Sequence, residues 1–475
     1  MAHYVEDRRD CELYTTGSLD SLLMADSPAR AIAQALQRLD FSEFDAVYRN
    51  DKGGRPALEP RSLCGVWILG MLRGIVYATR LAALCSSDIE FRWLVGDAGV
   101  EKSTLSGFFT RHRKKLTNLG AQVLTALGQE DLLPGENLGV DGTVVRAASS
   151  RHSSRTREHV EAQVRKIIEE RLSREAEGGA SCAQDEALER RKQRLDRALS
   201  RLDEMGLEHK EARVTVTEPS ARIQRQKDGS FAPGYNIQAV TDLDTGAIVT
   251  AQPVDAGNDA GQLEPQVSQA QAVLREVRAQ APAVAAVAAD GAYHDTMQLV
   301  SLETQGVACY VPEDRNTQRT PPGVSEKFRA QAFSYDESSD TMTCPEGQTL
   351  ARRKMNNEKT SVVYQASAES CGACPHKSEC CPKSQNGRSV NRPIHKETLD
   401  TVSARVSSET GQQMKRARSV VCEGAFARLQ GLLHWRRCRT WGWEGVQAET
   451  AWRQLAHNLM IWIGQWEPLT ATAKT

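Results

Sequence analysis

The sequence lacks an excess of charge of either sign. Its 475 residues include 60 Lys and Arg against 61 Asp and Glu, and the formal net charge is −1. A chain without a global basic excess can hold nucleic acid only through local patches, so composition neither supports nor excludes DNA as a partner. Hydrophobic residues make up 40% of the chain. That share is enough to build globular cores, and the length suggests about three domains.

Long apolar runs are also missing. No stretch of about 18 uncharged apolar residues occurs, and the charged segment from Met1 to Asp20 contains no apolar core of a signal peptide. We therefore expect neither secretion nor a membrane partner, and we expect the protein in the cytoplasm. In that reducing compartment the 12 cysteines are better interpreted as thiols, some of them binding metal, than as a disulfide framework.

The N-terminal region, residues 28 to 130, has the spacing of apolar residues that predicts helices. Thr104 is expected to cap the last of them, from Leu105 to Leu127. This helix carries a basic cluster formed by Arg111, Arg113, Lys114 and Lys115. The cluster either contacts DNA phosphates or forms a solvated helix face.

Short apolar runs typical of strands begin at Asn137. Residues 235–241 and 247–254, joined by an Asp- and Gly-containing turn, predict a β-hairpin, and residues 283–289 predict a buried strand. Between Asp141 and the hairpin, two charged helices separated at Gly178 to Ser181 predict a helical hairpin at about residues 152–212. Residues 313–345 and 382–412 are polar and turn-rich, whereas 413–433 and 448–466 favour helices.

Three carboxylates, Asp141, Asp290 and Glu423, are the strongest functional signal. Each Asp follows a short apolar run, and Glu423 lies in a segment with helical spacing. An isolated Asp at a strand end is usually a turn or cap residue. Three carboxylates brought together by a fold could instead hold two divalent cations for phosphoryl transfer.

The segments around these carboxylates resemble the motifs of insertion-sequence DDE transposases, most closely insertion-sequence family 1182. The similar segments follow in the same order as in that family and cover roughly residues 28–465: Phe91 to Leu94, Val140 to Thr143, Thr217 to Arg222, Gly234 to Gln238, Asn258 and Asp259, Ala289 to Tyr293, Val421 to Phe426, and Ala456 to Leu459.

The resemblance implies a ribonuclease-H-like mixed sheet flanked by helices. Asp141 is then expected on the first strand, Asp290 on the fourth and Glu423 on a later helix. The family's carboxylates bind two Mg²⁺ ions, for which Mn²⁺ can substitute. Related transposases often carry a Lys seven residues after the Glu, but here that position is Gln430. Arg418 fits the family pattern and is expected to bind a phosphate at the cleavage site.

Basic and aromatic residues surround the position where the family's Lys is missing. Candidate substitutes for it are Arg428, Arg436 and Arg437. Trp441 lies in a basic-aromatic stretch that could stack on an unpaired base while the arginines hold the backbone. Packing in a core is the alternative for the tryptophans of this stretch.

A cysteine cluster has the spacing of a structural zinc site. Cys371 and Cys374 form a C-x2-C pair, with Cys344 upstream. The fourth ligand is expected to be Cys380, with Cys381 or His376 as possible substitutes. The alternative is a set of reduced thiols without metal.

Together these patterns predict an α/β protein with four parts. These are an all-helical N-terminal DNA-binding domain (1–130), the first part of the catalytic core (131–312) with its helical-hairpin insertion, a Cys-rich module (313–412) and C-terminal core helices (413–475). The expected function is a bacterial, nucleoid-associated transposase. It would act as a homodimer, bind terminal inverted repeats as double-stranded DNA, cut there, and join the ends to target DNA. The alternatives are a nuclease of the same fold without strand transfer and a catalytically silent DNA-binding protein.

Overall fold

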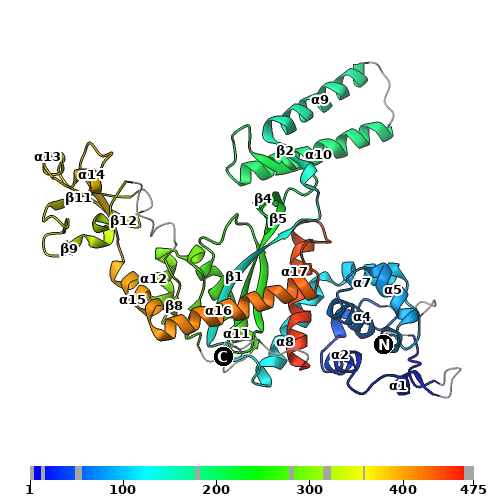
Figure 1. The fold of residues 1–475 in the computed structure, drawn as a ribbon. Helices are drawn as coiled ribbons and strands as arrows, with labels where there is room; N and C mark the ends of the chain where they lie inside the picture. The colour runs from blue at the N-terminus through cyan, green and yellow to red at the C-terminus, as the bar shows by residue number, and fades with distance from the viewer. Residues whose placement is uncertain are drawn as a thin grey trace. The chain divides into compact units, whose positions relative to one another are not determined.

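The computed structural model describes residues 5–11, 17–48, 56–176, 182–277, 283–313, 323–356 and 359–464. The chain divides into two compact units. The first comprises Met1–Asn258, Ser268–Ala283 and Ala417–Thr475, and the second comprises Asp259–Val267 and Val284–Arg416. Both helices and strands occur in each unit (Figure 1). The expected mixed α/β class is confirmed, whereas the ribonuclease-H-like arrangement stays a prediction.

The N-terminal part of the first unit is helical, as the sequence predicts. Its helices are α1 (Leu19–Leu22), α2 (Pro28–Gln37), α3 (Ser42–Asp45), α4 (Pro60–Leu72), α5 (Ala78–Ser87), α6 (Ile89–Leu94), α7 (Lys102–Arg111) and α8 (Arg113–Gln129). Local signals set several helix starts. The Ser27 side chain caps α2, which has Pro28 at its first position, and the Asp88 side chain caps α6.

One helix of this region differs from the prediction. The expected single helix over 105–127 is wrong, because the chain breaks at His112 between α7 and α8, and Thr104 lies inside α7 rather than at its cap. The His112 ring is fully buried, with its centroid 4.9 Å from the rings of Phe44 and Phe108. Burying this ring requires a turn that the helical periodicity does not indicate.

An antiparallel sheet follows in the same unit. Strand β1 (Asn137–Arg146) pairs with β5 (Phe231–Asp242) in a register that sets Asp141 opposite Ala239. Strand β5 also pairs with β4 (Arg222–Arg225) and β6 (Ile248–Val254). The predicted hairpin is thus confirmed as β5 and β6. Asp242 stabilises its turn by accepting hydrogen bonds from the backbone N–H groups of Gly135 and Thr245.

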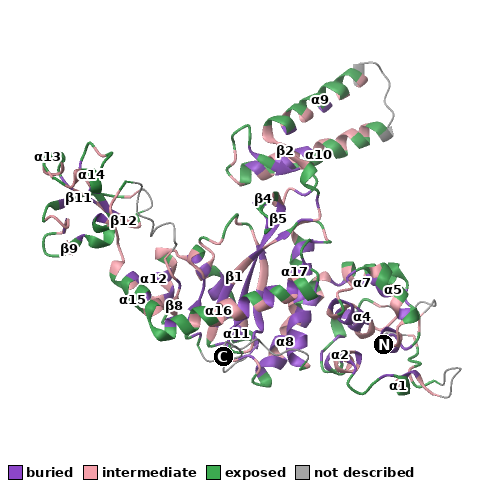
Figure 2. Ribbon diagram, in the orientation of Figure 1, coloured by how far each residue is buried: buried purple, intermediate pink, exposed green. Residues whose placement is uncertain are grey.

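Helix α17 (Gly442–Trp462) closes the core of the first unit. It packs against α8 and β6, and most of its residues are buried (Figure 2). Asn458 joins helix and strand directly: its side-chain oxygen accepts from Ile248 N at 2.9 Å and its amide donates to Ile248 O at 2.8 Å. His457, fully buried beside it, contacts Gly246 O at 2.9 Å. This part of the C-terminus therefore has a structural role.

The predicted helical hairpin is confirmed within the described residues. Helices α9 (Arg157–Ala176) and α10 (Cys182–Glu204) pack on each other and on a small sheet of β2 (Ser154–Thr156) and β3 (Arg213–Thr215), after the short helix η1 (Arg151–Ser153). A core that includes Val160, Ile167 and Leu202 holds them together. The expected break at Gly178 to Ser181 lies outside the described residues.

The second unit contains two groups of strands. Strand β7 (Ala286–Ala288) pairs in parallel with β8 (Ala308–Tyr310), and α12 (Thr296–Thr304) and α15 (Lys396–Ser407) pack near β8. The expected buried strand over 283–289 is confirmed as β7. Before β7, the chain forms the first turns of α11 (Leu263–Val277).

The Cys-rich region has more regular structure than its polar sequence predicts. It forms a five-stranded antiparallel sheet in the order β13-β12-β11-β10-β9. The strands are β9 (Ser334–Asp336), β10 (Thr341–Thr343), β11 (Thr349–Met355), β12 (Ser361–Gln365) and β13 (Ser389–Pro393); short helices accompany them: η3 (Glu326–Phe328), η4 (Ala330–Ala332), α13 (Ala368–Gly372) and α14 (Lys377–Cys380). Phe328, Leu350 and Tyr364 belong to its separate core.

Helix α16 (Glu409–Ala427) completes the fold and continues into a π-helical turn, η5 (Arg428–Leu432). The helix begins in the second unit, and from Ala417 its residues belong to the first. Of the helices in the described part of the chain, none is long and apolar enough to cross a membrane.

Candidate functional site

Asp141 lies in the middle of strand β1, on the same face as Thr143, because side chains alternate along a strand. Its carboxylate forms an ion pair with Arg418 of α16, with 2.8 Å between Oδ1 and Nη2. The same Oδ1 accepts from Gly142 N at 2.9 Å. The side chains of Asp141 and Arg418 are 15% and 13% exposed, so this is a partly buried pair at the edge of solvent.

Two contacts fix the end of α16 and its π-turn along this face of β1. One is the Arg418 pair with Asp141, and the other is a 2.7 Å hydrogen bond that Gln430 Nε2 donates to Thr143 Oγ1. Between them the helix approaches the strand closely. A Cβ on Gly139 would lie 2.6 Å from Cys422 Sγ, so a larger residue at 139 would push the helix away.

Glu423 follows the residue at this close approach. Its side chain is exposed, and Oε1 accepts from Ser419 Oγ at 2.9 Å. Burial raises the pKa of the neighbouring Cys422 thiol to about 12, and the negative charges of Asp141 and Glu423 both add to that rise. The Cys422 thiol therefore lies within electrostatic reach of both carboxylates. The space beside Gly424, the next residue, is open, because a Cβ on Gly424 would meet no atom within 4 Å.

Asp290 belongs to the second unit. It follows β7 and caps the short helix η2 (Gly291–Tyr293), with its Oδ1 accepting from Ala292 N at 2.9 Å. The expected position at the end of a strand is confirmed, and so is the local capping role. Over the described ranges, no three His, Cys, Asp or Glu side chains come together in a group that could hold a metal ion. The strand of Asp141 and the helix of Glu423 thus contact each other, and a shared site of Asp141, Glu423 and Asp290 stays a prediction.

The predicted basic residues near α16 have different environments. Burial lowers the pKa of Arg428 to about 9, and its charge lowers the pKa of the buried His457, so Arg428 faces the interior. Arg437 donates to the backbone oxygens of Ala147, Ala148 and Ser149. Of these three arginines, Arg436 has an exposed side chain that makes no such contact with the described residues.

The tryptophans of the basic-aromatic stretch also divide into two kinds. Trp435 is fully buried, which bears out core packing for this residue. Trp441, immediately before α17, is 56% exposed. The exposed Trp441 ring offers an aromatic face to a ligand. The nearby Arg439 is held by another aromatic residue, because its guanidinium lies 4.0 Å from the ring centre of Tyr77.

The basic cluster of the N-terminal region surrounds the start of α8. Arg111 ends α7, and Arg113, Lys114 and Lys115 occupy the first turn of α8, where no acidic residue occurs. Cations at a helix N-terminus oppose the helix dipole and cost stability. The chain therefore concentrates positive potential at this point, which favours an anionic ligand.

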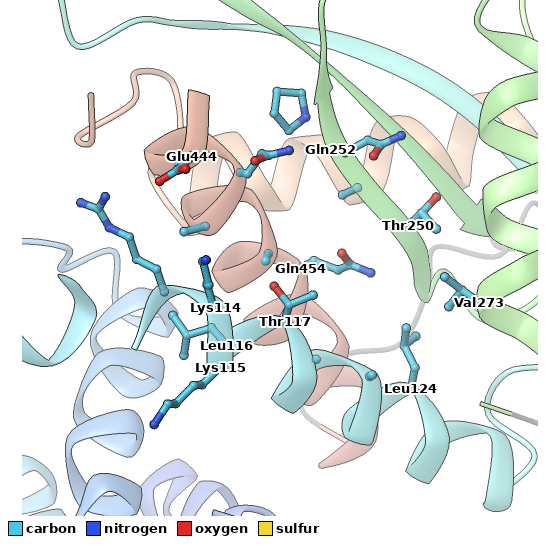
Figure 3. Close-up of a pocket in the computed structure, with 18 of the residues that line it drawn as sticks. Lys114, Lys115, Leu116, Thr117, Leu124, Thr250, Gln252, Val273, Glu444 and Gln454 are labelled. Atoms are coloured by element: carbon cyan, nitrogen blue, oxygen red, sulfur yellow. The ribbon is translucent and has the colours of Figure 1, made fainter. Parts of the chain in front are cut away.

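A groove of about 820 Å³ opens beside this helix start. It is lined by α8, β6, α11 and α17, all through residues of the first unit. Figure 3 shows Thr117 of α8 and Gln454 of α17 on opposite sides of the groove, and the Lys115 amino group directed away from it. Lys115 instead donates to Glu43 O, so Arg111, Arg113 and Lys114 are the cations of the cluster that can serve the groove.

One contact near the carboxylates had no signal in the sequence. Lys227, in the turn between β4 and β5, donates from Nζ to Gln430 Oε1 at 2.6 Å. The two residues are separated by 203 positions. Gln430 occupies the position at which the resemblance leads one to expect a lysine, so an ammonium group lies beside that position after all.

The five cysteines of the cluster line one small cavity of about 20 Å³ in the second unit, and none of them forms a disulfide. Gln348 N donates to Cys344 Sγ at 3.2 Å and Arg388 N donates to Cys371 Sγ at 3.3 Å. The ring nitrogens of His376 lie 3.7 Å and 4.0 Å from carboxylate oxygens of Glu346 and Glu379. His376 is thus engaged by acids rather than directed at the thiols.

Comparison with known families adds independent information. The model of a transposase domain (DUF772) matches residues 17–111, and the model of the transposase DDE domain matches residues 343–461. The second match includes Arg418, Glu423 and the cysteines but neither Asp141 nor Asp290. No curated protein and no solved structure matches the chain. The two family matches support a DDE transposase, and therefore an enzyme that acts on DNA.

Proposed function

We propose that this protein is an insertion-sequence transposase of the family 1182 type. It binds the terminal inverted repeats of its own element, cuts DNA there and joins the ends to target DNA. The observation that carries this proposal is the ion pair between Arg418 and Asp141, which positions the Glu423 helix along the Asp141 strand. Because both ends of an element must be cut in concert, we propose that the active form is a dimer on DNA.

Asp141, Glu423 and Asp290 are the proposed metal ligands. Carboxylate oxygens are the donors that Mg²⁺ and Mn²⁺ prefer, and Asp141 and Glu423 supply them from one region of the first unit. When bound, Mg²⁺ would stabilise the charge on the attacking and leaving oxygens of the phosphodiester. The Arg418 guanidinium neutralises Asp141, and with DNA bound Arg418 would hold a phosphate at the cut.

DNA recognition is proposed to rest on the N-terminal helices and on the exposed residues near α17. Arg113 and Lys114 are proposed to bind backbone phosphates at the groove beside α8, with Arg111 next to them. Trp441 and Arg436 are proposed to hold an unpaired base and its phosphate near the cut. The half-buried Arg428 and the backbone-bound Arg437 are the weaker candidates for DNA contact.

The test is incubation of the full chain with Mg²⁺ and a labelled duplex that carries one end of the element, identified from inverted repeats flanking the reading frame. Joined products support transposition, cut products alone support a nuclease, and a gel shift without cutting supports a DNA-binding protein. Asp141→Asn, Asp290→Asn and Glu423→Gln should each abolish cutting but retain binding, because the amide keeps the shape and removes the charge. Near-normal cutting by one variant removes that residue from the site.

We also propose a structural zinc ion bound by Cys344, Cys371, Cys374 and either Cys380 or Cys381, whose binding would draw together thiols that form no metal-holding group in the described chain. The support is the shared cavity of the five thiols and the N–H groups donated to two of the sulfurs. Purified protein should contain about one zinc per chain, and Cys371→Ser should lower the melting temperature. Cys309→Ser, a buried thiol outside the module, is the matched control. Elemental analysis without zinc in protein prepared without chelators contradicts this site.

A further inference from the structure

We propose that Lys227 is a phosphate-binding residue of the cleavage site and that Gln430 positions it. The inference rests on the proposed function, because it assigns Lys227 to the same phosphodiester that the carboxylates would act on. Lys227 Nζ donates to Gln430 Oε1, and Gln430 Nε2 donates to Thr143 Oγ1. This chain of two hydrogen bonds connects an exposed ammonium group to the strand that carries Asp141.

The spacing along strand and helix puts the ammonium group near the carboxylates. Asp141 and Thr143 lie on one face of β1, about 7 Å apart at the usual rise per residue. Glu423 lies in the last turns of α16, and Gln430 lies in the π-helical turn that follows it, seven residues further on. Lys227 therefore lies at the Thr143 end of this strand face, beside the turn that follows the Glu423 helix.

The turn that holds Lys227 is well defined. Gln226 is 6% exposed, and its side-chain amide donates to Gln224 O and Ala232 O across the turn. Gly229 adopts φ +80°, a conformation that other residues rarely take, which closes the turn. The backbone at Lys227 is thus fixed, and only the flexible stem of the side chain has to be ordered by Gln430.

The charge of Lys227 is not neutralised locally. The adjacent Asp228 is paired with Arg146 and accepts from Ser230 N and Oγ. No carboxylate among the described residues forms a salt bridge with Lys227. An ammonium group has donors only, so it must face the amide oxygen of Gln430, and the amide nitrogen is then directed at Thr143. Two further donors of Lys227 remain for an anion.

A structural role for this contact makes a different prediction from phosphate binding. An exposed hydrogen bond to a neutral partner contributes little to folding. If the contact only anchors the turn, its loss should leave both cleavage and salt dependence unchanged. If Lys227 binds a phosphate, loss of Lys227 should slow cleavage of the ordinary duplex. It should have a smaller effect on a duplex in which the contacted phosphate has been made uncharged.

The experiment compares Lys227→Ala with wild type, with Lys210→Ala as a charge-matched control at the exposed base of the helical hairpin. Cleavage of the labelled end duplex should fall by about 10-fold or more in Lys227→Ala, at an unchanged melting temperature. The double variant Lys227→Ala with Gln430→Lys should recover most of the loss, because the new ammonium group lies where Gln430 held the old one.

Uncharged methylphosphonate links, placed singly along the duplex, identify the contact. One position should weaken cleavage by wild type and have no further effect on Lys227→Ala. Equal cleavage by Lys227→Ala and wild type overturns the assignment to Lys227, and so does methylphosphonate sensitivity that is the same in both. These results leave the proposed function intact as long as the wild-type chain cuts the end duplex. A wild-type chain that does not cut the end duplex would instead refute the proposed function itself.

Discussion

Glu423 is exposed in the first unit and Asp141 is partly buried, whereas Glu218 and Glu449 are 2% and 4% exposed within it. Glu218 accepts hydrogen bonds from Ser149 N, Tyr235 Oη and Gly442 N. Its carboxylate thereby connects β5 to the start of α17, and both of its oxygens are engaged by the protein.

Glu449 is enclosed in a similar way by residues just before and within α17. It accepts from Arg439 N and from Thr440 N and Oγ1, and it pairs with the buried Arg453. The Glu423 carboxylate, by contrast, accepts one side-chain hydrogen bond from the described residues, that of Ser419. Buried carboxylates surrounded by donors stabilise the fold, while an exposed carboxylate with few protein donors is available to a cation.

The largest effect expected from this comparison is on catalysis. Glu423→Gln should reduce strand cutting below detection while the urea midpoint of unfolding stays within experimental error, since an exposed side chain contributes little to stability. Glu409→Gln, an exposed change near the start of the same helix, is the control. A clear loss of stability in Glu423→Gln would place Glu423 with the structural carboxylates.

The second effect is on stability. Glu449→Gln leaves the Arg453 guanidinium, 4% exposed, without its charged partner, and should lower the free energy of unfolding by about 3 to 5 kcal/mol. Glu444→Gln, exposed on the same helix, should lower it by about 0.5 kcal/mol at most. Chemical denaturation measures both variants. An unfolding curve of Glu449→Gln that matches wild type would contradict the structural role of the enclosed pair.

The smallest effect is on the pH dependence of folding. Burial lowers the pKa of His457 in α17 to about 3, so the folded chain keeps it neutral while the unfolded chain protonates it below its ordinary pKa of about 6.5. Its contribution is fully present above that ordinary pKa and is lost as the pH falls. The loss is about 1.4 kcal/mol per pH unit down to the folded pKa.

His457→Gln removes the titrating group. The slope of unfolding free energy against pH should therefore be shallower in His457→Gln than in wild type by about 1.4 kcal/mol per unit between about pH 4 and 6. Equal slopes in the two proteins would show that His457 does not stay neutral in the folded chain.

The sequence predicts the parts of the fold that depend on local pattern. The hairpin of β5 and β6, the paired helices α9 and α10, and the strand before Asp290 all have clear periodicity or turn residues. The break at His112 has no such signal, because it arises from burial against Phe44 and Phe108. The sheet of the Cys-rich module is hidden for a related reason. Strand β11, for example, has one buried residue, so apolar alternation is weak.

The candidate site is predicted in its residue types but not in its contacts. The positions of Asp141 and Glu423 follow from motifs, whereas the Arg418 pair with Asp141 depends on how α16 packs on β1. The link from Lys227 to Gln430 joins a turn and a helix that are far apart in the chain. A single sequence indicates which residues carry charge, but tertiary packing determines which of them meet.

The most direct test of the central claim is whether one metal site contacts all three carboxylates. Fe²⁺ can replace Mg²⁺ in such a site, and with ascorbate and peroxide it generates radicals that cut the polypeptide near the bound ion. The expected fragments end near residues 141, 290 and 423, and they disappear with excess Mg²⁺ and in Asp141→Asn. Cuts near 141 and 423 without any near 290, or cuts that excess Mg²⁺ does not suppress, would contradict the shared site.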